Sequence, residues 1–528
     1  MAALTSSLAP SIVFHLARAL GSGDPQMELA AALACQATQA GHVCADLDQS
    51  AGWGPWAEAM DAAQRADFRA RLPGMAIVGA AEDWTPLVWD GRRLYLRRYW
   101  DYERTVATDL AARAAIARPV DAALERQLAE MFADAGQRRA ACVALTRGLC
   151  LVSGGPGTGK THTLARIIGL LQAREPGLRI ALAAPTGKAA ARMGDALRAA
   201  GVLVADEAQT LHRLLGLRAD GSGYYRNKER PLATDVLVVD EASMIDLSLM
   251  AHLLAALPAT ARLILLGDRD QLAAVEAGAV FADLCASPRL AGCVATLTTN
   301  FRFGAASSIG RLADALRAGD ATEAIAHLQA GGGDVGWRDG DARALAAAAR
   351  DGYAAYREAV LAGAAPAELF ERFARFRVLC ALRSDVAAVN RALGDALASG
   401  LPVMVHRNDV LLRLFNGDIG LVLPDPADGA LKVCFPTEGG TYRWIPAVRL
   451  PAWEPAWAMT VHKSQGSEFE RVLLVLPPVA TRGASRELVY TGVTRAKQGV
   501  ELQAGEDVLR SAIGNRAERM SALCEKLA

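Results

Sequence analysis

Short apolar runs alternate with amphipathic segments from about residue 145 onward. Four of these runs have the length of a buried strand, at residues 149–153, 179–184, 236–240 and 262–267. The first two are each followed by apolar positions at helical spacing, in THTLARIIGLLQA and KAAARMGDALRAA. Buried strands that alternate with helices are typical of a doubly wound parallel sheet, so the pattern predicts an α/β fold.

A second group of apolar runs lies late in the chain, at residues 377–382, 471–477 and 499–503. Between them, residues 401–450 combine short apolar stretches with turns rich in proline and glycine, which predicts a small all-β insert. The length of 528 residues suffices for three or four domains. We therefore expect two parallel-sheet domains, the second interrupted by the insert.

The first 110 residues differ in composition from the rest. They contain no lysine, nine arginines and thirteen acidic residues. They also hold five of the nine tryptophans, which are Trp53, Trp56, Trp84, Trp89 and Trp100. This shift indicates a separate N-terminal domain, whose tryptophans form either a partner interface, the alternative we favour, or a small core.

Charge and cysteine content narrow the class of protein. The 57 basic and 57 acidic residues cancel, which excludes coating of nucleic acid through gross positive charge but not local basic surfaces. The nine cysteines are widely spaced without a C-x-x-C pair, so we expect reduced core thiols. The start has no basic segment and no apolar run reaches 18 residues, which predicts a cytoplasmic protein with no membrane span.

The most specific motif is a glycine-rich loop at residues 154–161, GGPGTGKT, between a predicted strand and a predicted helix. It matches G-x-x-x-x-G-K-[ST], in which glycines let backbone N–H groups surround phosphates and the helix N-terminus adds favourable partial charge. In such a loop Lys160 reaches the β- and γ-phosphates, and the Thr161 hydroxyl holds Mg²⁺. The alternative, a glycine-rich surface turn, does not explain both flanking elements.

A pair of carboxylates, Asp240 and Glu241, ends the apolar run VLVVDE. A D-E pair after a strand is commonplace by itself. Combined with the phosphate loop, it predicts Asp240 as the Mg²⁺ partner and Glu241 as the base that activates water.

Further stretches occur in the order of the superfamily 1 helicase motifs, namely DEAS (240–243), GDRDQL (267–272), TNFRF (299–303), TVHKSQGSEF (460–469) and YTGVTRAK (490–497). Two others, APTGKAAARM (184–193) and TLHRLLG (210–216), match the DNA-facing motifs of that superfamily. Together with LFNGDIG and LYLRRYWDYERTVA, these stretches most resemble the RecD family. Its members are the alpha subunits of exodeoxyribonuclease V (RecBCD enzyme) and are SF1B DNA helicases. The resemblance covers nearly the whole chain.

The resemblance implies roles for residues outside the phosphate loop. Arg302 and Arg495 would bring planar donors to the γ-phosphate across a cleft, which suits a transition state in which charge shifts. Gln271 would sense the γ-phosphate, Gln137 would read adenine, and Glu468 would lie near the ribose. The implied catalytic residues are Lys160, Asp240, Glu241, Gln271, Arg302 and Arg495. The implied ATP site consists of Gln137, Gly154, Gly155, Pro156, Gly157, Thr158, Gly159, Lys160, Thr161, His162 and Glu468, with Mg²⁺ on Thr161 and Asp240.

A third implied set contacts DNA. Short polar or cationic side chains at sheet edges suit phosphate and sugar contact without base reading, as a translocating motor requires. The set consists of Pro185, Thr186, Lys188, Thr210, His212, Thr460 and His462. Alternatively, His212 and His462 are ordinary structural histidines.

The implied architecture is two RecA-like P-loop NTPase motor domains on doubly wound parallel sheets, an SH3-like β insert and a mainly helical N-terminal domain. The expected bounds are 1–115 for a partner-docking domain, 116–370 for the first motor domain, 371–400 with 455–528 for the second, and 401–454 for the SH3-like insert. Residues 216–232 would form a second insert, either a pin that parts duplex strands or a mobile loop.

The function implied is an ATP-driven 5′→3′ single-strand DNA motor, the direction resting on the resemblance alone. It would act on the 5′-ended strand of a duplex end, in a heterotrimer with RecB-like and RecC-like subunits, for recombination and repair. The chain offers no acidic cluster for a nuclease site of its own. The alternatives are a stand-alone RecD-like helicase and an assembly subunit with a vestigial motor, and the intact Lys160, Glu241, Arg302 and Arg495 argue against the latter.

Overall fold

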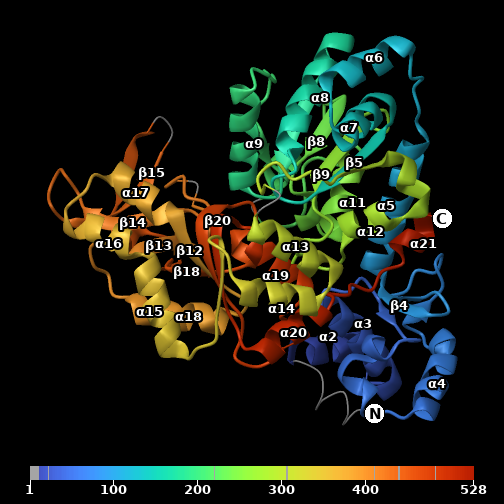
Figure 1. Cartoon of the computed structure of the whole chain (residues 1–528). Coiled ribbons are helices and arrows are strands. Elements are labelled where there is room, and N and C mark those ends of the chain that lie inside the picture. The colour runs from blue at the N-terminus through green and yellow to red at the C-terminus, as the bar shows by residue number, and fades with distance from the viewer. Residues whose placement is uncertain are drawn as a thin grey trace. The chain divides into compact units, whose positions relative to one another are not determined.

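The computed structural model describes residues 11–21, 23–218, 220–304, 307–409, 411–437, 440–481 and 483–527 (Figure 1). The chain divides into two compact units. The first comprises Met1–Arg269, Ala273–Thr299 and Glu518–Ala528, and the second Asp270–Leu272 and Asn300–Ala517.

The N-terminal part of the first unit is helical, as predicted, with a small sheet of order β1-β4-β3-β2. Asp24 caps one helix by accepting the Gln26 N–H at 2.8 Å. The helices are α2 (Ser11–Gly21), α3 (Pro25–Gln39), α4 (Ala62–Arg71) and α5 (Arg97–Ala115), with 3₁₀ turns η1 (Ser50–Ala57) and η2 (Leu72–Gly74). The strands are β1 (Ala45–Asp46), β2 (Val78–Gly79), β3 (Leu87–Trp89) and β4 (Arg93–Leu96).

The tryptophans of this region divide between core and surface. Trp53 and Trp56 are fully buried, and Trp100 is 9% exposed. Trp84, by contrast, is 95% exposed. Burial of Trp53, Trp56 and Trp100 agrees with a core role for these three, while a partner interface at the exposed Trp84 stays a prediction.

The rest of the first unit is a parallel sheet of order β10-β5-β9-β8-β6-β7. Its strands are β5 (Leu149–Gly154), β6 (Ile180–Ala184), β7 (Gln209–Thr210), β8 (Val236–Val239), β9 (Arg262–Gly267) and β10 (Val294–Leu297). Its helices are α6 (Ala122–Met131), α7 (Ala135–Thr146), α8 (Lys160–Arg174), α9 (Gly187–Ala199), α10 (Leu211–Leu215), α11 (Leu247–Ala256) and α12 (Val280–Ala286), with η3 (Ala242–Met244) and η4 (Pro288–Cys293).

Both faces of this sheet are covered. Alternate residues of β9 enter different cores, because Leu263 and Leu265 belong to one cluster and Ile264 and Leu266 to the other. A strand buried on both faces reads as a continuous apolar run, which is why the sequence pattern located β5, β6, β8 and β9. The predicted doubly wound parallel sheet is confirmed.

The second unit has its own parallel sheet, of order β11-β20-β19-β12-β18. Its strands are β11 (Val335–Arg338), β12 (Phe376–Cys380), β18 (Ala458–Thr460), β19 (Phe469–Val475) and β20 (Ala496–Gln503). Its helices are α13 (Ser308–Ala318), α14 (Ala321–Ala330), α15 (Ala342–Gly352), α16 (Ala354–Leu361), α17 (Pro366–Arg375), α18 (Arg383–Leu393), α19 (Arg486–Val493) and α20 (Glu506–Gly514), with η7 (His462–Ser464).

The predicted β insert is an antiparallel sheet of order β16-β15-β14-β13-β17. Its strands are β13 (Pro402–Val405), β14 (Ile419–Pro424), β15 (Leu431–Pro436), β16 (Tyr442–Ile445) and β17 (Trp453–Pro455). A 3₁₀ turn, η6 (Ala447–Arg449), lies between β16 and β17. The all-β insert is thus present, and its likeness to an SH3 fold stays a prediction.

Two of the expected bounds differ from the division into units. We expected the first motor domain to end at residue 370, but residues 300–370 lie in the second unit, because β11 pairs with β20 in the second sheet. We also expected the second motor domain to extend to residue 528. The chain instead returns at Glu518, and α21 (Leu523–Leu527) packs in the first unit.

The cysteines are free thiols, and most of them are buried. Burial raises the pKa of the Cys150 thiol and keeps it protonated. In the part of the chain that the structure describes, no helix combines the length and apolar character that a membrane crossing needs.

Candidate functional site

The glycine-rich loop joins the end of β5 to the start of α8 (Figure 1). Gly157 and Gly159 have φ of 82° and 79°, in the left-handed region that favours glycine. At Gly154 a Cβ atom would lie 2.6 Å from the Thr158 hydroxyl oxygen, which leaves no room for a side chain. The glycines therefore allow the tight bend of this loop, and its binding of phosphate stays a prediction.

The side chains of the loop converge on its own backbone. The Lys160 ammonium donates to the carbonyl oxygens of Gly154 at 2.5 Å and Gly155 at 3.1 Å. The Thr158 hydroxyl donates to the Gly155 carbonyl at 2.8 Å. Thr161 lies in the first turn of α8, at the helix N-terminus whose N–H groups favour a bound anion.

The two carboxylates follow β8, which neighbours β9 and β6 in the first sheet. Asp240 is buried and its Oδ1 accepts the Glu241 N–H at 2.8 Å. Glu241 has φ of 53°, a conformation that costs a non-glycine residue about 1 kcal/mol and that occurs at functional sites. The chain therefore holds a strained turn where the pair of carboxylates leaves the sheet.

Burial and the neighbouring Glu241 charge raise the pKa of the Asp240 carboxyl, and the cations Lys160 and Arg192 oppose this rise. Arg192 of α9 donates from Nη2 to the Glu241 Oε1 at 2.8 Å. Arg192 is a site residue that the sequence does not predict, although it lies within the stretch 184–193. A sequence feature that could have indicated it is the spacing of four residues from Lys188, which puts both side chains on one face of the helix after β6.

Gln137, the expected adenine reader, lies in the first turn of α7 and is buried. Its backbone N–H is accepted by Asp134 Oδ1 at 2.9 Å, which caps the helix. The Thr299 hydroxyl donates to the other Asp134 oxygen at 2.7 Å. These hydrogen bonds hold the pKa of Asp134 below its ordinary value and tie the start of α7 to the end of the first sheet's last strand.

In the second unit, Arg302 and Glu468 form an ion pair at 2.6 Å, and both are partly buried. Lys497 lies 3.7 Å from the other Glu468 oxygen. The structure thus joins two expected nucleotide residues to each other. Glu468 has the position of a carboxylate that holds Arg302 in a set orientation, while its expected ribose contact stays a prediction.

Other motif residues of the second unit also meet. Arg495 is buried, with Nε donating to the Thr491 carbonyl at 3.3 Å and Nη1 to the Ser467 carbonyl at 3.4 Å. Gln271 is buried in the short segment Asp270–Leu272 that belongs to this unit. The Leu272 N–H donates to the Thr491 hydroxyl at 2.9 Å. Three separate motif stretches therefore lie together here.

The expected DNA-contacting threonines cap helices. Thr186 accepts the Ala189 N–H at the start of α9, at 3.3 Å, and Thr210 accepts the Arg213 N–H at the start of α10, at 3.2 Å. Thr460 ends β18 and accepts the Lys463 N–H at 3.3 Å. The remaining members lie beside them, with Pro185 before α9, Lys188 in its first turn, His212 in α10 and His462 at the start of η7.

The insert at residues 216–232 is a folded hairpin in its described part. Tyr225 N–H donates to the Gly216 carbonyl at 2.9 Å, and Leu217 pairs with Tyr224. Tyr224 packs against His212 and His252, at ring distances of 6.2 and 5.0 Å. Tyr225 is half exposed. The hairpin is thus anchored beside a predicted DNA-contacting histidine, and strand separation by it stays a prediction.

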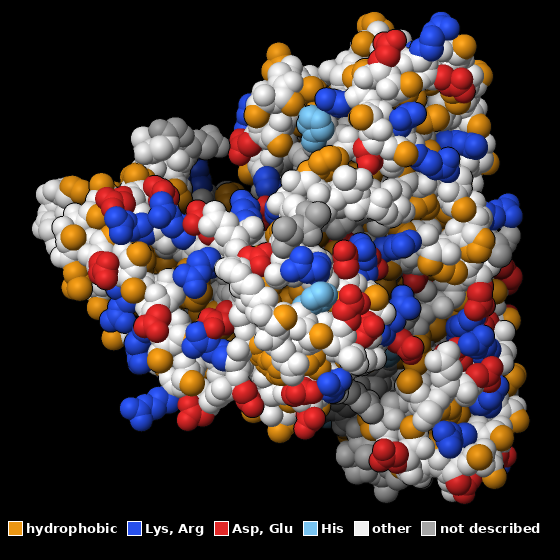
Figure 2. All heavy atoms as spheres, viewed as in Figure 1, with side chains coloured by type: hydrophobic (Ala, Val, Ile, Leu, Met, Phe, Trp, Pro, Cys, Tyr) orange, Lys and Arg blue, Asp and Glu red, His pale blue; other side chains and the backbone are white. Residues whose placement is uncertain are grey.

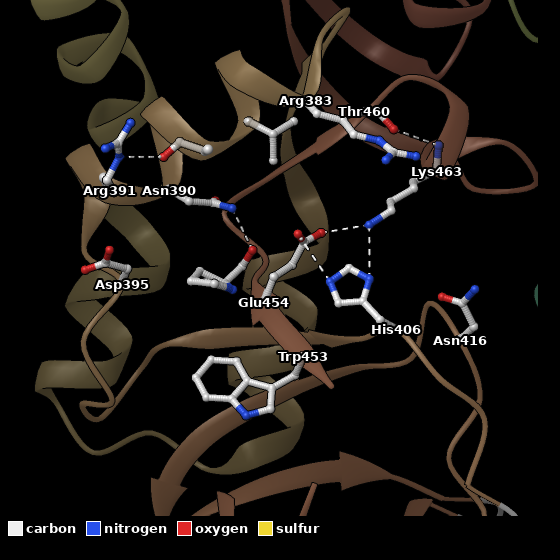
Figure 3. Close-up of a pocket in the computed structure, with 13 residues that line it drawn as sticks. Arg383, Asn390, Arg391, Asp395, His406, Asn416, Trp453, Glu454, Thr460 and Lys463 are labelled. Carbon is white, nitrogen blue, oxygen red and sulfur yellow. Dashed lines mark hydrogen bonds and ion pairs between the residues drawn. The ribbon is translucent and has the colours of Figure 1, made fainter. Parts of the chain in front are cut away.

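A cavity of about 740 Å³ lies in the second unit, between α18, the insert and the loop after β18 (Figure 3). Thr460, an expected DNA contact, lines it together with Lys463. On the molecular face in Figure 2, basic and acidic side chains are interspersed. Among the described residues, no group of three or more His, Cys, Asp or Glu side chains is arranged to hold a metal ion.

Three family models match the chain. An AAA domain matches residues 137–277, a UvrD-like helicase C-terminal domain matches residues 455–502, and the model described as RecBCD enzyme subunit RecD, N-terminal domain, matches residues 9–95. Each match coincides with one of the regions described above.

Curated RecD relatives match over most of their length, and a RecD2 relative matches over half of its length. The RecBCD enzyme subunit RecD of Mycobacterium tuberculosis (strain CDC 1551 / Oshkosh) is 40% identical over 97% of this chain and 94% of its own. The protein of the same name from Haemophilus influenzae is 35% identical over 73% of this chain and 71% of its own. The ATP-dependent RecD2 DNA helicase of Deinococcus radiodurans is 34% identical over 72% of this chain and 50% of its own. A solved structure, Pif1 helicase from Candida albicans, is similar over 74% of this chain and 96% of its own, with 18% identity and a TM-score of 0.42.

Proposed function

Because the chain belongs to the RecD family of RecBCD enzyme subunits, we propose that it is the strand-tracking subunit of a heterotrimer with RecB-like and RecC-like partners. The chain is an ATP-dependent DNA helicase. In the cytoplasm, this heterotrimer would process duplex ends for recombination and repair.

The observation that carries the proposal is the phosphate loop with two carboxylates beyond it. Lys160 and the backbone N–H groups of Gly155 and residues 157–161 would bind the β- and γ-phosphates of ATP. Thr161 and Asp240 would hold Mg²⁺, which when bound offsets charge on the phosphate oxygens. They fit this role, since Mg²⁺ commonly takes one or two protein oxygens and completes its shell with phosphates and water.

Glu241 would accept the proton of the attacking water. Its carboxylate is ion-paired with Arg192 and lies next to the residue expected to hold the metal. Arg302, Arg495 and Gln271 of the second unit would respond to the γ-phosphate, and Gln137 and Glu468 would contact the adenosine part. Since an arginine fork stabilises charge that spreads over phosphoryl oxygens, both arginines suit hydrolysis better than simple binding.

The strand would be held by Pro185, Thr186, Lys188, Thr210, His212, Thr460 and His462. Backbone-directed contacts of this kind do not read bases, so they allow movement along any sequence. We propose 5′→3′ travel from the family assignment alone, on the 5′-ended strand of a duplex end.

The central test compares single-strand-stimulated ATPase in the wild type and Lys160→Gln. Loss of the ammonium from the γ-phosphate should lower the rate by about a hundredfold or more. Arg174→Gln, at the other end of α8 and paired with Asp121 at 3.3 Å, is the matched control and should keep the wild-type rate. Equal hydrolysis by the wild type and Lys160→Gln would refute the nucleotide site.

The partner proposal rests on Trp84. This side chain is almost fully exposed in the N-terminal region, and tryptophan is enriched at binding hot spots. Trp84→Ala should weaken co-purification with RecB-like and RecC-like subunits by at least about tenfold, equivalent to roughly 1.4 kcal/mol, while ATPase is retained. Leu361→Ala, at an apolar residue of the second unit that is 88% exposed, should leave complex formation unchanged.

A further inference from the structure

A carboxylate of the β insert pairs with a lysine and lies beside a histidine in the lining of the cavity of the second unit. Glu454 Oε1 accepts from the Lys463 ammonium at 2.8 Å, and its Oε2 lies 3.2 Å from His406 Nε2. The Lys463 ammonium is also 3.4 Å from His406 Nδ1. Figure 3 shows the Glu454 carboxylate pointing toward Lys463 and His406.

Two different parts of the second unit build this cluster. Glu454 lies on β17 opposite Met404 of β13, and the His406 N–H donates to the Ala452 carbonyl at 2.8 Å, so both side chains are fixed to the insert sheet. Lys463 lies on η7, where its N–H donates to Thr460, an expected DNA contact. The insert therefore pairs a carboxylate with a lysine of the stretch expected to contact the DNA strand.

The lining of the cavity contains both basic and acidic side chains. The basic ones include Arg383, Arg391 and Lys463, and the acidic ones are Asp395 and Glu454. The side chains of Lys463 and Glu454 are 34% and 33% exposed, so water and ions reach the pair. A carboxylate and a phosphodiester present the same kind of oxygen acceptor to an ammonium. Glu454 thus holds the acceptor position that a strand phosphate would take.

We propose that Glu454 is a positioning residue that competes with a phosphate of the tracked strand for Lys463. Binding of the phosphate displaces the carboxylate, and departure of the phosphate restores the ion pair. The competition lowers the affinity of each strand position, which favours release as the motor advances. This inference rests on the proposed function, because it takes single-stranded DNA as the ligand.

The test measures equilibrium binding of a fluorescent oligo-dT to the full chain without nucleotide. Exposed ion pairs contribute little, so Glu454→Gln should tighten binding by about two- to fivefold. Without the carboxylate, Lys463 is free to neutralise one more phosphate when the strand binds. Binding should then release one more counterion from the DNA, and the slope of log K against log salt should steepen by about 0.7. Adding Lys463→Met to Glu454→Gln should abolish the gain.

Glu371→Gln is the matched control, because it removes the same charge from an exposed arginine pair on α17, 2.5 Å from Arg375. Its affinity and salt slope should equal those of the wild type. Unchanged or weaker binding by Glu454→Gln, or an equal gain in the control, overturns the proposal. If thermal unfolding shows that Glu454→Gln does not fold, Glu454→Asp, which withdraws the carboxylate by one methylene, replaces it with the same expected direction.

Failure of the proposed function gives a different result. A wild type that does not bind oligo-dT contradicts the strand-tracking role itself. A wild type that binds, with Glu454→Gln no tighter than Glu371→Gln, contradicts only the competition.

Discussion

Asp240 and Glu241 are adjacent in sequence and share the cation Arg192, which acts on each of them in a different way. Asp240 is buried, which raises the pKa of its carboxyl, and Lys160 and Arg192 offset part of that rise. Glu241 instead carries a direct ion pair with Arg192. One arginine therefore acts on both carboxylates, and it does so from a helix whose start is an expected DNA contact.

This arrangement predicts the effect of Arg192→Met. Without the guanidinium, the pKa of Asp240 should rise further, so that less of the carboxylate form is present to hold Mg²⁺. The Mg²⁺ concentration for half-maximal ATPase at neutral pH should increase by about threefold or more. Arg198→Met on the same helix, which breaks an exposed pair with Asp195, is the control. A lower maximal rate with an unchanged Mg²⁺ dependence would show that Arg192 does not act through Asp240.

Residue spacing could predict the phosphate loop because Gly154, Gly159 and Lys160 are required by backbone geometry and charge. It could not predict Arg192, one of fifty arginines in the chain. Its pairing with Glu241 depends on how α9 lies on the sheet, 49 residues away along the chain. A local pattern carries no information of that kind.

At the scale of elements, α9 and α10 are capped by Thr186 and Thr210, which are also expected DNA contacts. Each hydroxyl accepts a backbone N–H of its helix, so it contributes to stability whether or not DNA is bound. Loss of DNA binding after removal of the threonine would therefore not prove a DNA contact. A substitution that keeps the cap and changes the charge separates the two roles.

Thr186→Asp provides that separation, because aspartate caps helices at least as well as threonine. The midpoint of thermal unfolding should stay within about 2 °C of the wild type, while single-strand affinity falls because the added charge repels phosphate. Thr186→Ala should instead lower the unfolding free energy by about 1 kcal/mol, because it removes the cap. Undiminished strand binding by Thr186→Asp would remove this threonine from the DNA site.

The same scale explains which elements the sequence could predict. Strands buried on both faces, such as β5 and β9, form apolar runs and were found. Short strands were missed, because β7 has two residues and β18 three, too few for a period. The sheet to which β11 belongs was also beyond prediction, since its pairing with β20 joins residues more than 160 positions apart.

At the scale of the whole molecule, the chain leaves the first unit at residue 299 and returns at Glu518. The returning segment is held by main-chain bonds, with the Val43 N–H donating to the Met520 carbonyl at 2.8 Å. The Ala522 N–H donates to Glu103 Oε1, also at 2.8 Å. Both ends of the second unit are thus tethered to the first, which a sequence read as successive domains does not anticipate.

The returning segment ends in an ion pair inside the protein. The Lys526 ammonium lies 2.7 Å from Glu103 Oε2, which is fully buried, and 3.3 Å from the Trp100 ring centroid. Lys526→Met removes the cation and leaves the Glu103 charge buried without it. The unfolding free energy of the full chain should fall by about 3 kcal/mol, measured by calorimetry or denaturant titration.

The double variant Lys526→Met with Glu103→Gln separates charge from packing. The glutamine carbonyl still accepts the Ala522 N–H, and no unpaired charge is left in the interior, so most of the loss should be recovered. Arg510→Met, which breaks an exposed pair with Glu506 on α20, should change stability by no more than about 0.5 kcal/mol. A double variant as unstable as Lys526→Met would show that the lysine holds the segment through its contact with Trp100, because removal of the buried charge would then have brought no gain.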